Sequence, residues 1–128
     1  MTDWKQIFSR TTLRELFPQE RTDAFFDALF GDASEGAYDI ELSFDRYDRA
    51  ARNLRFLLNL RERPGRCLAC NLTYGLPQVF SRHPLLAVGK LAQTLCAQVQ
   101  AAPASWELTS TREISRSLHV IPFIIKIA

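Results

Sequence analysis

The chain lacks the long hydrophobic run that a membrane helix needs, because no stretch of about 18 uncharged apolar residues occurs in it. Its first residues also lack a basic segment followed by an apolar stretch, which is the pattern of a secretory signal. Neither a membrane span nor a signal peptide is therefore expected. Hydrophobic residues make up 47% of the 128 residues, which is enough for one core, so a single domain over residues 1–128 is predicted.

Cysteine is also scarce, with three residues in the whole chain. An odd number of cysteines in a chain that can build its own hydrophobic core gives no reason to expect a disulfide framework. Free thiols in a reducing, cytoplasmic compartment are the expectation.

Cys67 and Cys70 form a C-x-x-C pair, and His83, Cys96 and His119 could complete a zinc site on paper. If the pair lies on a strand, however, residues three apart point to opposite faces and cannot converge on one ion. A redox pair would normally open a helix, whose N-terminus lowers the thiol pKa. The sequence therefore predicts no metal and no cofactor, inert cysteines, and a structural role for His119 within an apolar strand.

Both acidic and basic residues occur along the whole chain, but they are distributed unevenly. Four basic and nine acidic residues give residues 1–44 a net charge of −5, whereas residues 45–66 carry +4 and the remainder +3. Such asymmetry is explained either by a binding surface or by an acidic helical layer lying against a basic sheet. An acidic helical layer against a basic sheet is the preferred explanation, because the positive and negative charges of the whole chain nearly cancel.

The first third of the sequence changes from a helical to a strand pattern. Apolar residues and a capping-box spacing at Thr12 predict a short helix, a break and another turn within residues 4–17. Pro18 is expected to be the first residue of a helix that stops at Gly31. Residues 38–45 then alternate apolar and polar side chains, which predicts a half-buried strand.

A hairpin is predicted in the middle of the chain. Residues 54–61 repeat the alternation, and Pro64 and Gly65 occupy the two central positions of a type II turn. Residues 68–74 are therefore expected to fold back as the third strand.

The last third of the sequence has the patterns of one helix and two strands. Pro84 is expected to open an amphipathic helix whose core stripe consists of Val88, Leu91, Ala92, Leu95, Cys96 and Val99. Residues 106–109 and 118–127 read as strands, and Pro122, which cannot donate to a ladder, predicts an edge position or a bulge in the last one.

The predicted order is thus helix, three strands, helix, two strands. Short hairpin connections favour an α+β fold, in which an antiparallel sheet of about five strands has its helices packed on one face. This order resembles the layout of type III secretion chaperone-like domains, which are small dimeric binders of other proteins. The resemblance lies in element order alone, and no motif carries it.

An anion site is predicted just before the helix expected at Pro84. Ser81, Arg82 and His83 would stand at its N-terminus, where free N–H groups and the helix dipole favour a phosphate or carboxylate. The alternative is that Ser81 is only a cap and Arg82 only solvated.

The arginines between residues 45 and 66 are the candidate contacts to nucleic-acid phosphates, with Tyr47 and Phe56 available to stack on bases. The positions predicted for this role are Arg46, Arg49, Arg52 and Arg55. Acidic residues interrupt the positive field, and Phe56 belongs to an apolar face. A solvated sheet face with internal ion pairs is therefore preferred to nucleic acid.

Aromatic residues are abundant in the N-terminal segment, beyond what a short helix needs to cover a sheet. The residues concerned are Trp4, Phe8, Phe17, Phe25, Phe26 and Phe30. Core packing is the default for them, but a surplus would leave an apolar surface for a homodimer or for a docked partner segment. The leading hypothesis is a non-enzymatic protein-interaction module, an adaptor or chaperone-like subunit, with a small anion-binding domain or a nucleic-acid-binding domain as alternatives. No catalytic residue is predicted, because two histidines and scattered carboxylates offer no nucleophile, base and orienting group together.

Overall fold

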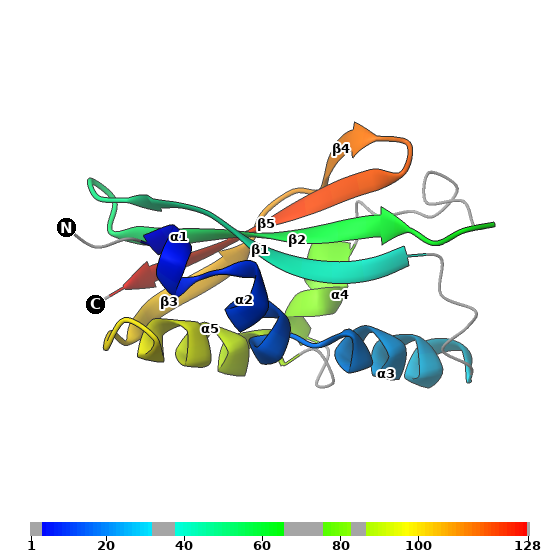
Figure 1. The fold of residues 1–128 in the computed structure, drawn as a ribbon, viewed down its shortest axis with the longest axis horizontal. Coiled ribbons are helices and arrows are strands. Elements are labelled where there is room, and N and C mark those ends of the chain that lie inside the picture. Colours follow the sequence, from blue (N-terminus) through cyan, green and yellow to red (C-terminus); the bar gives the residue numbers. More distant parts are fainter. Residues whose placement is uncertain (1–3, 32–37, 66–75, 83–86, 128) are drawn as a thin grey trace.

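The computed structural model describes residues 4–31, 38–65, 76–82 and 87–127. The elements along the chain (Figure 1) are α1 (Trp4–Ile7), α2 (Arg10–Leu16), α3 (Gln19–Phe30), β1 (Tyr38–Asp48), β2 (Asn53–Glu62), α4 (Leu76–Arg82), α5 (Val88–Ala97), β3 (Pro103–Leu108), β4 (Arg112–Ser115) and β5 (Leu118–Ile127). The predicted α+β class with an antiparallel sheet of five strands is confirmed. None of the helices in these ranges has the length and apolar character to cross a membrane.

The sheet has the strand order β1-β2-β5-β3, and β4 pairs with β5 beyond the end of β3. Strands β1 and β2 form a hairpin, and β5, which comes from the C-terminal end of the chain, pairs with the other side of β2. From Asn53 to Arg61, therefore, both edges of β2 are occupied. The predicted third strand at residues 68–74 lies outside the described residues.

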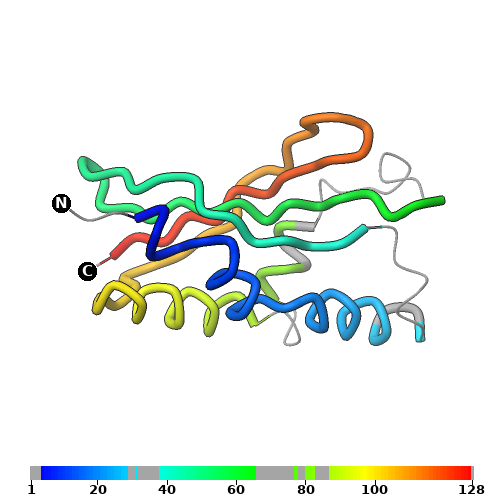
Figure 2. Tube along the Cα trace, in the orientation of Figure 1, coloured from blue at the N-terminus to red at the C-terminus, as the bar shows by residue number. Residues whose placement is uncertain are grey.

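The helices lie on one side of the sheet (Figure 1), with α5 and α3 following one another along the long axis of the molecule (Figure 2). The register between the strands shows which side chains form the face of the sheet that the helices cover. Leu42, Leu58 and Ile121 stand side by side in one row, and the neighbouring row is made of three phenylalanines. Five of these six side chains are buried and that of Phe44 is partly buried, while the residues between them on β1 are half-exposed, so the alternation predicted for the first strand is confirmed.

The centre of the core is aromatic. The Phe56 ring lies 5.0 Å from that of Phe8 and 5.4 Å from that of Phe44, with centroid distances and edge-on angles that suit aromatic pairs. Phe8, Phe17, Phe25 and Phe26 are all buried, and Trp4 stacks on Tyr47. The N-terminal aromatics described here pack the core, which was the default expectation; the side chain of Phe30 lies outside the described part.

Local signals account for the ends of α2 and α3. Ser9, rather than the predicted Thr12, caps α2, because its hydroxyl accepts a hydrogen bond from the Thr12 amide at 3.3 Å. Pro18 immediately precedes α3, and Gly31 ends it in the left-handed conformation (φ 80°) with its amide bonded to the Asp27 carbonyl.

The segment before the last helix differs from the prediction. Residues 76–82, which stand between the strand predicted at 68–74 and the helix predicted from Pro84, form α4, which buries Phe80 against the Phe25 ring at 5.5 Å. The helix expected from Pro84 begins instead at Val88, although its buried stripe through Cys96 is the predicted one. A seven-residue helix with one large apolar anchor is too short to produce a recognisable period.

Pro122 does not lie on an edge strand, so that half of the prediction is wrong, and the pairing of β5 with β2 runs through Pro122 without the register shift of a bulge. Strand β5 pairs with β2 on one side, and with β3 and then β4 on the other. The Pro122 carbonyl accepts from the Thr109 amide at 3.0 Å, which places the proline at the point where β3 has ended and β4 has not begun. The missing N–H faces this break, so little of the ladder is lost.

Tyr38, at the start of β1, makes the stability of the fold sensitive to alkaline pH. Its buried ring packs edge-on against Phe26 at 4.9 Å, and burial raises its pKa far above the ordinary value of 10.0. Above about pH 10 the Tyr38 hydroxyl of the unfolded chain loses its proton, whereas that of the folded chain keeps it. The contribution to stability is therefore complete below pH 10 and is lost as the pH rises further, at a rate approaching about 1.4 kcal/mol per pH unit.

We expect Tyr38→Phe to remove most of this loss in urea unfolding measured between about pH 8 and pH 11. The buried Cys96 thiol, whose pKa burial also raises above 9.0, contributes in the same direction and remains in the variant. Tyr47→Phe, a change at a half-buried tyrosine of the same strand, is the control and should keep the wild-type alkaline profile. Equal profiles for Tyr38→Phe and wild type would contradict the assignment.

Candidate binding groove at the β1 edge

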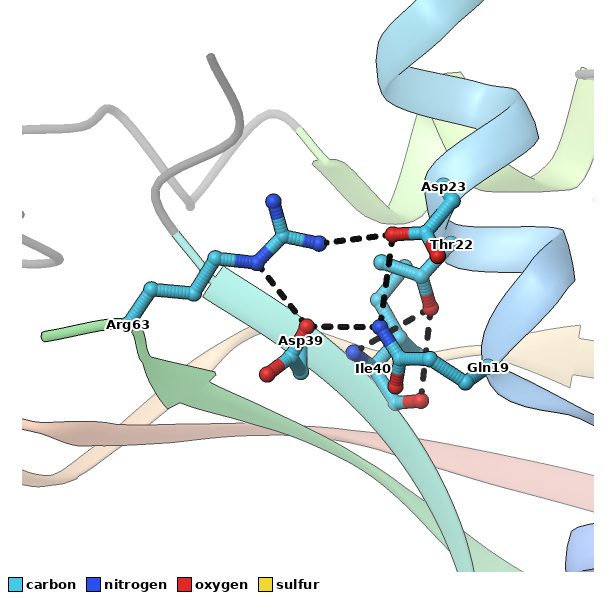
Figure 3. A network of polar contacts seen from close by, with 6 residues as sticks. All are labelled: Gln19, Thr22, Asp23, Asp39, Ile40 and Arg63. Carbon is cyan, nitrogen blue, oxygen red and sulfur yellow. Dashed lines mark hydrogen bonds and ion pairs between the residues drawn. The ribbon is translucent and has the colours of Figure 1, made fainter. Parts of the chain in front are cut away.

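Strand β1 lies at one edge of the sheet, and helix α3 covers only part of that edge. The Thr22 hydroxyl, fully buried on α3, contacts both the amide and the carbonyl of Ile40, at 3.3 and 3.4 Å (Figure 3). The backbone groups of Ile40 therefore face away from β2. Because alternate residues of a strand turn their backbone groups to the same side, those of Leu42 also face this edge.

No hydrogen bond from the described helices reaches the backbone of Leu42. The backbone groups of the preceding residue, Glu41, face β2 instead, and the Glu41 carbonyl accepts a hydrogen bond from the Asn59 side chain at 3.0 Å. Leu42 thus offers a donor and an acceptor on the side of β1 where none of the described strands pairs.

Two adjoining hollows of about 290 Å³ each lie along this edge, between β1 and the first two helices. They share Arg10, Glu41, Leu42 and Arg61, so they form one continuous groove. We call it the β1-edge groove and define it by residues 39–44 of β1, Arg61 of β2, and the helix-side residues Lys5, Phe8, Ser9, Arg10, Leu13, Arg14, Phe17 and Gln19.

The groove has an apolar floor and a basic rim. Phe8, Leu13 and Phe44 line one half, while Phe17 and Ile40 line the other. Four cationic residues surround them, namely Lys5, Arg10, Arg14 and Arg61, and all four are exposed. Two carboxylates, Asp39 and Glu41, are the acidic groups of the lining, so the groove is positively charged overall.

Glu41 lies between two arginines at the middle of the groove. Its carboxylate is 3.8 Å from the Arg10 guanidinium and 3.9 Å from that of Arg61. The arginine side chains are 75% and 54% exposed, so these long pairs contribute little to stability and can exchange partners.

Asp39, by contrast, is held in a tight network at the end of the groove (Figure 3). Arg63 donates to Asp39 at 2.9 Å and to Asp23 at 3.1 Å, and the Gln19 amide donates to Asp39 at 2.7 Å. The Arg63 side chain is 16% exposed and lies over the Phe26 ring at 5.3 Å. We call Arg63, Asp39, Asp23 and Gln19 the Arg63 network; it joins α3 to the ends of β1 and β2.

The structure does not place Ser81 and Arg82 at the start of a helix, where the anion site was predicted. Both lie in the last turn of α4, where the Ser81 hydroxyl donates to the Pro77 carbonyl at 2.6 Å and Arg82 is exposed. Free carbonyls at this end of a helix do not favour an anion, so the helix N-terminus does not support a site at these two residues, and anion binding there stays a prediction. His83 lies outside the described residues.

The arginines predicted to contact nucleic acid gather at the closed end of the β1–β2 hairpin. Arg46, Arg49 and Arg52 are exposed, while Arg55 is half-buried and lies 3.8 Å from Asp48. The aromatic rings proposed for base stacking are occupied, since Tyr47 stacks on Trp4 at 4.6 Å and Phe56 is fully buried. Nucleic-acid binding at this end stays a prediction.

The cysteines and histidines are only partly described. Cys67 and Cys70 lie outside the described residues, whereas Cys96 is buried on α5 and His119 is buried in β5 opposite Leu60. Across the described ranges, no cluster of three metal-binding side chains occurs.

The sequence did not point to the β1-edge groove. One signal was present: a hairpin centred near residue 50 brings Glu41 beside Arg61, because both stand on the polar face of alternating strands. Nothing local, however, indicates that β1 stays at an edge or that α2 lies along it.

Comparison with known proteins finds no matching family model, and neither a curated protein nor a solved structure matches the chain significantly.

Proposed function

We propose that this protein is a non-enzymatic protein-interaction module, an adaptor or chaperone-like subunit, that binds an extended segment of a partner protein in the β1-edge groove. The observation that carries the proposal is the strand edge at Leu42, which opens onto a groove with an apolar floor. An extended peptide can add to such an edge through backbone hydrogen bonds, while alternate side chains enter the adjoining hollows.

The length of the open edge suits binding of a short extended segment better than strand-to-strand pairing with a second copy of the chain. Thr22 already satisfies the backbone of Ile40, and the register between β1 and β2 shifts after Phe44, where a bulge interrupts the strand. The stretch between these two points is too short for long strand-to-strand pairing between copies. It is long enough for a few residues of a bound segment.

The hollows on either side of Leu42 add specificity to backbone pairing. Apolar side chains of the segment would pack on the partly exposed Phe44 ring, and the rim residues would contact its polar side chains. Burial of apolar area supplies affinity in this mode, and the side-chain pockets select the sequence.

The experiment is selection of a displayed random peptide library on the full chain, followed by amide hydrogen exchange of the complexes. We expect selected peptides to slow exchange of the Leu42 amide about tenfold or more, because it gains a hydrogen bond. The amide of Ile40, already bonded to Thr22, serves as the internal control and should change less.

Three outcomes would contradict the proposal. One is that the library yields no binder, and another is that selected peptides protect amides elsewhere and leave that of Leu42 unchanged. The third is a dimer in light scattering with Leu42 protected before any peptide is added, because a second copy would then fill the groove.

A further inference from the structure

We infer that the β1-edge groove selects an acidic segment, with carboxylate side chains at alternate positions of the extended partner chain. This inference rests on the proposed function and adds to it the chemistry of the partner. Four observations support it: the excess of cationic side chains in the lining, the state of the two carboxylates there, the position of Glu41 and the spacing of the arginines.

The excess of positive charge is larger than a count of the lining suggests. Of the two carboxylates, Asp39 is already engaged by Arg63 and Gln19 at 2.9 and 2.7 Å. Glu41 is then the remaining acidic partner for Lys5, Arg10, Arg14 and Arg61 within the groove lining. Bringing an acidic segment here relieves repulsion among these cations, whereas a basic segment would increase it.

Glu41 marks where a partner carboxylate fits. Its carboxylate lies within 4 Å of both Arg10 and Arg61, which come from α2 and from β2 on the two sides of the β1 edge. Both contacts are long and exposed, so Arg10 and Arg61 can turn to an incoming carboxylate at little cost. A guanidinium also binds a carboxylate through two parallel hydrogen bonds, which a long pair to Glu41 does not use.

The helix-side cations are spaced to match an extended chain. The segment from α1 to α2 runs antiparallel to β1, because Lys5 lies in the half of the groove near Phe44 and Arg14 in the half near Asp39. Arg10 and Arg14 stand one helical turn apart, about 6 Å along the axis. Alternate residues of an extended strand are separated by about 6.8 Å, so consecutive same-side carboxylates can reach both arginines.

The test uses two synthetic peptides of about eight residues, both acetylated and amidated at their ends, which is the length of an ordinary strand. One alternates valine and glutamate, and the other has glutamine in place of every glutamate. Binding is measured by fluorescence anisotropy, and exchange of the Leu42 amide confirms the site. We expect the glutamate peptide to bind about tenfold more tightly than the glutamine peptide at low salt.

Variants of the groove should change this preference in opposite directions. Arg10→Gln combined with Arg61→Gln should make the affinities for the two peptides equal, because the carboxylate contacts are lost. Glu41→Gln should tighten binding of the glutamate peptide about threefold and leave the glutamine peptide unchanged, because a competing carboxylate is removed. Arg46→Gln combined with Arg49→Gln removes the same two positive charges at exposed arginines outside the groove; it is the matched control for the double variant and should leave both affinities as in wild type.

The outcomes separate this inference from the function on which it rests. Library peptides that protect Leu42, together with equal binding of the two synthetic peptides, would overturn the acidic preference and leave the interaction module standing. If neither synthetic peptide nor any library peptide protects Leu42, both fail. Displacement of the glutamate peptide by free glutamate or inorganic phosphate at the same concentration would also overturn the inference, since a small anion would then suffice.

Discussion

Phe56→Ala is expected to lower the free energy of unfolding by about 3–5 kcal/mol, the range for removing a fully buried phenylalanine. Phe56 stands at the centre of β2, where its ring contacts those of Phe8, Phe44 and Phe123. Truncation leaves a cavity between the link from α1 to α2 and strands β1, β2 and β5, and rings held from several elements cannot all move in to fill it. Urea unfolding followed by circular dichroism measures the loss.

The matched control is Leu57→Ala on the next residue of the same strand. Leu57 points to the face of the sheet opposite the helices and is only half-buried, so its truncation should cost clearly less, about 1 kcal/mol. Equal losses for the two variants would mean that the helix-covered face of β2 has been assigned wrongly. Because Phe8 and Phe44 also form part of the groove floor, Phe56→Ala should weaken peptide binding even where the protein remains folded.

Arg63→Met is expected to cost about 2 kcal/mol of stability, the second largest effect. The guanidinium joins Asp39 and Asp23 and lies over Phe26, so its loss leaves two neighbouring carboxylates without their shared cation. Breaking a fully buried pair costs more than this, but the two aspartates are 43% and 47% exposed and keep part of their hydration. Methionine preserves most of the apolar contact, so the change tests the charge and the hydrogen bonds.

Arg61→Met, two residues earlier on β2, serves as the comparison for Arg63→Met. It removes an exposed arginine whose contact with Glu41 is 3.9 Å long, and its effect on stability should stay within about 0.5 kcal/mol. Arg63→Lys should fall between Arg63→Met and wild type, because it keeps the charge but loses the planar fork that reaches two carboxylates. If both methionine variants cost the same, the Arg63 network adds nothing beyond an exposed ion pair.

Several elements could be predicted because their signals are local. Alternation over residues 38–45, the apolar stripe from Val88 to Cys96 and the glycine at position 31 each describe a structure that forms within a few residues. These signals work because side-chain period and backbone conformation are properties of neighbouring residues. They also sufficed for the α+β class.

Other elements had no local signal. Strand β4 consists of four exposed residues that are held in an extended conformation by pairing with β5. Helix α4 is anchored by Phe80, whose burial depends on Phe25 in a helix far earlier in the chain. Pro122 was assigned to an edge because it lacks an amide donor, but the place where β3 gives way to β4 could not be read from residues around the proline.

For the described elements other than α4 and β4, the sequence by itself determined whether a segment is helical or extended and which of its faces is apolar. It also determined where the charges of each sign stand along the chain. Only the tertiary structure decided that β5 pairs beside β2, that β1 is the end strand of the described sheet, and that α2 lies along it with Arg10 reaching over to Glu41. Periodicity is set by adjacent residues, whereas the order of strands is set by contacts between residues that are distant in sequence, here between β2 and β5. The groove belongs to the second kind of property, because its floor, edge and rim come from different elements and meet only in the folded chain.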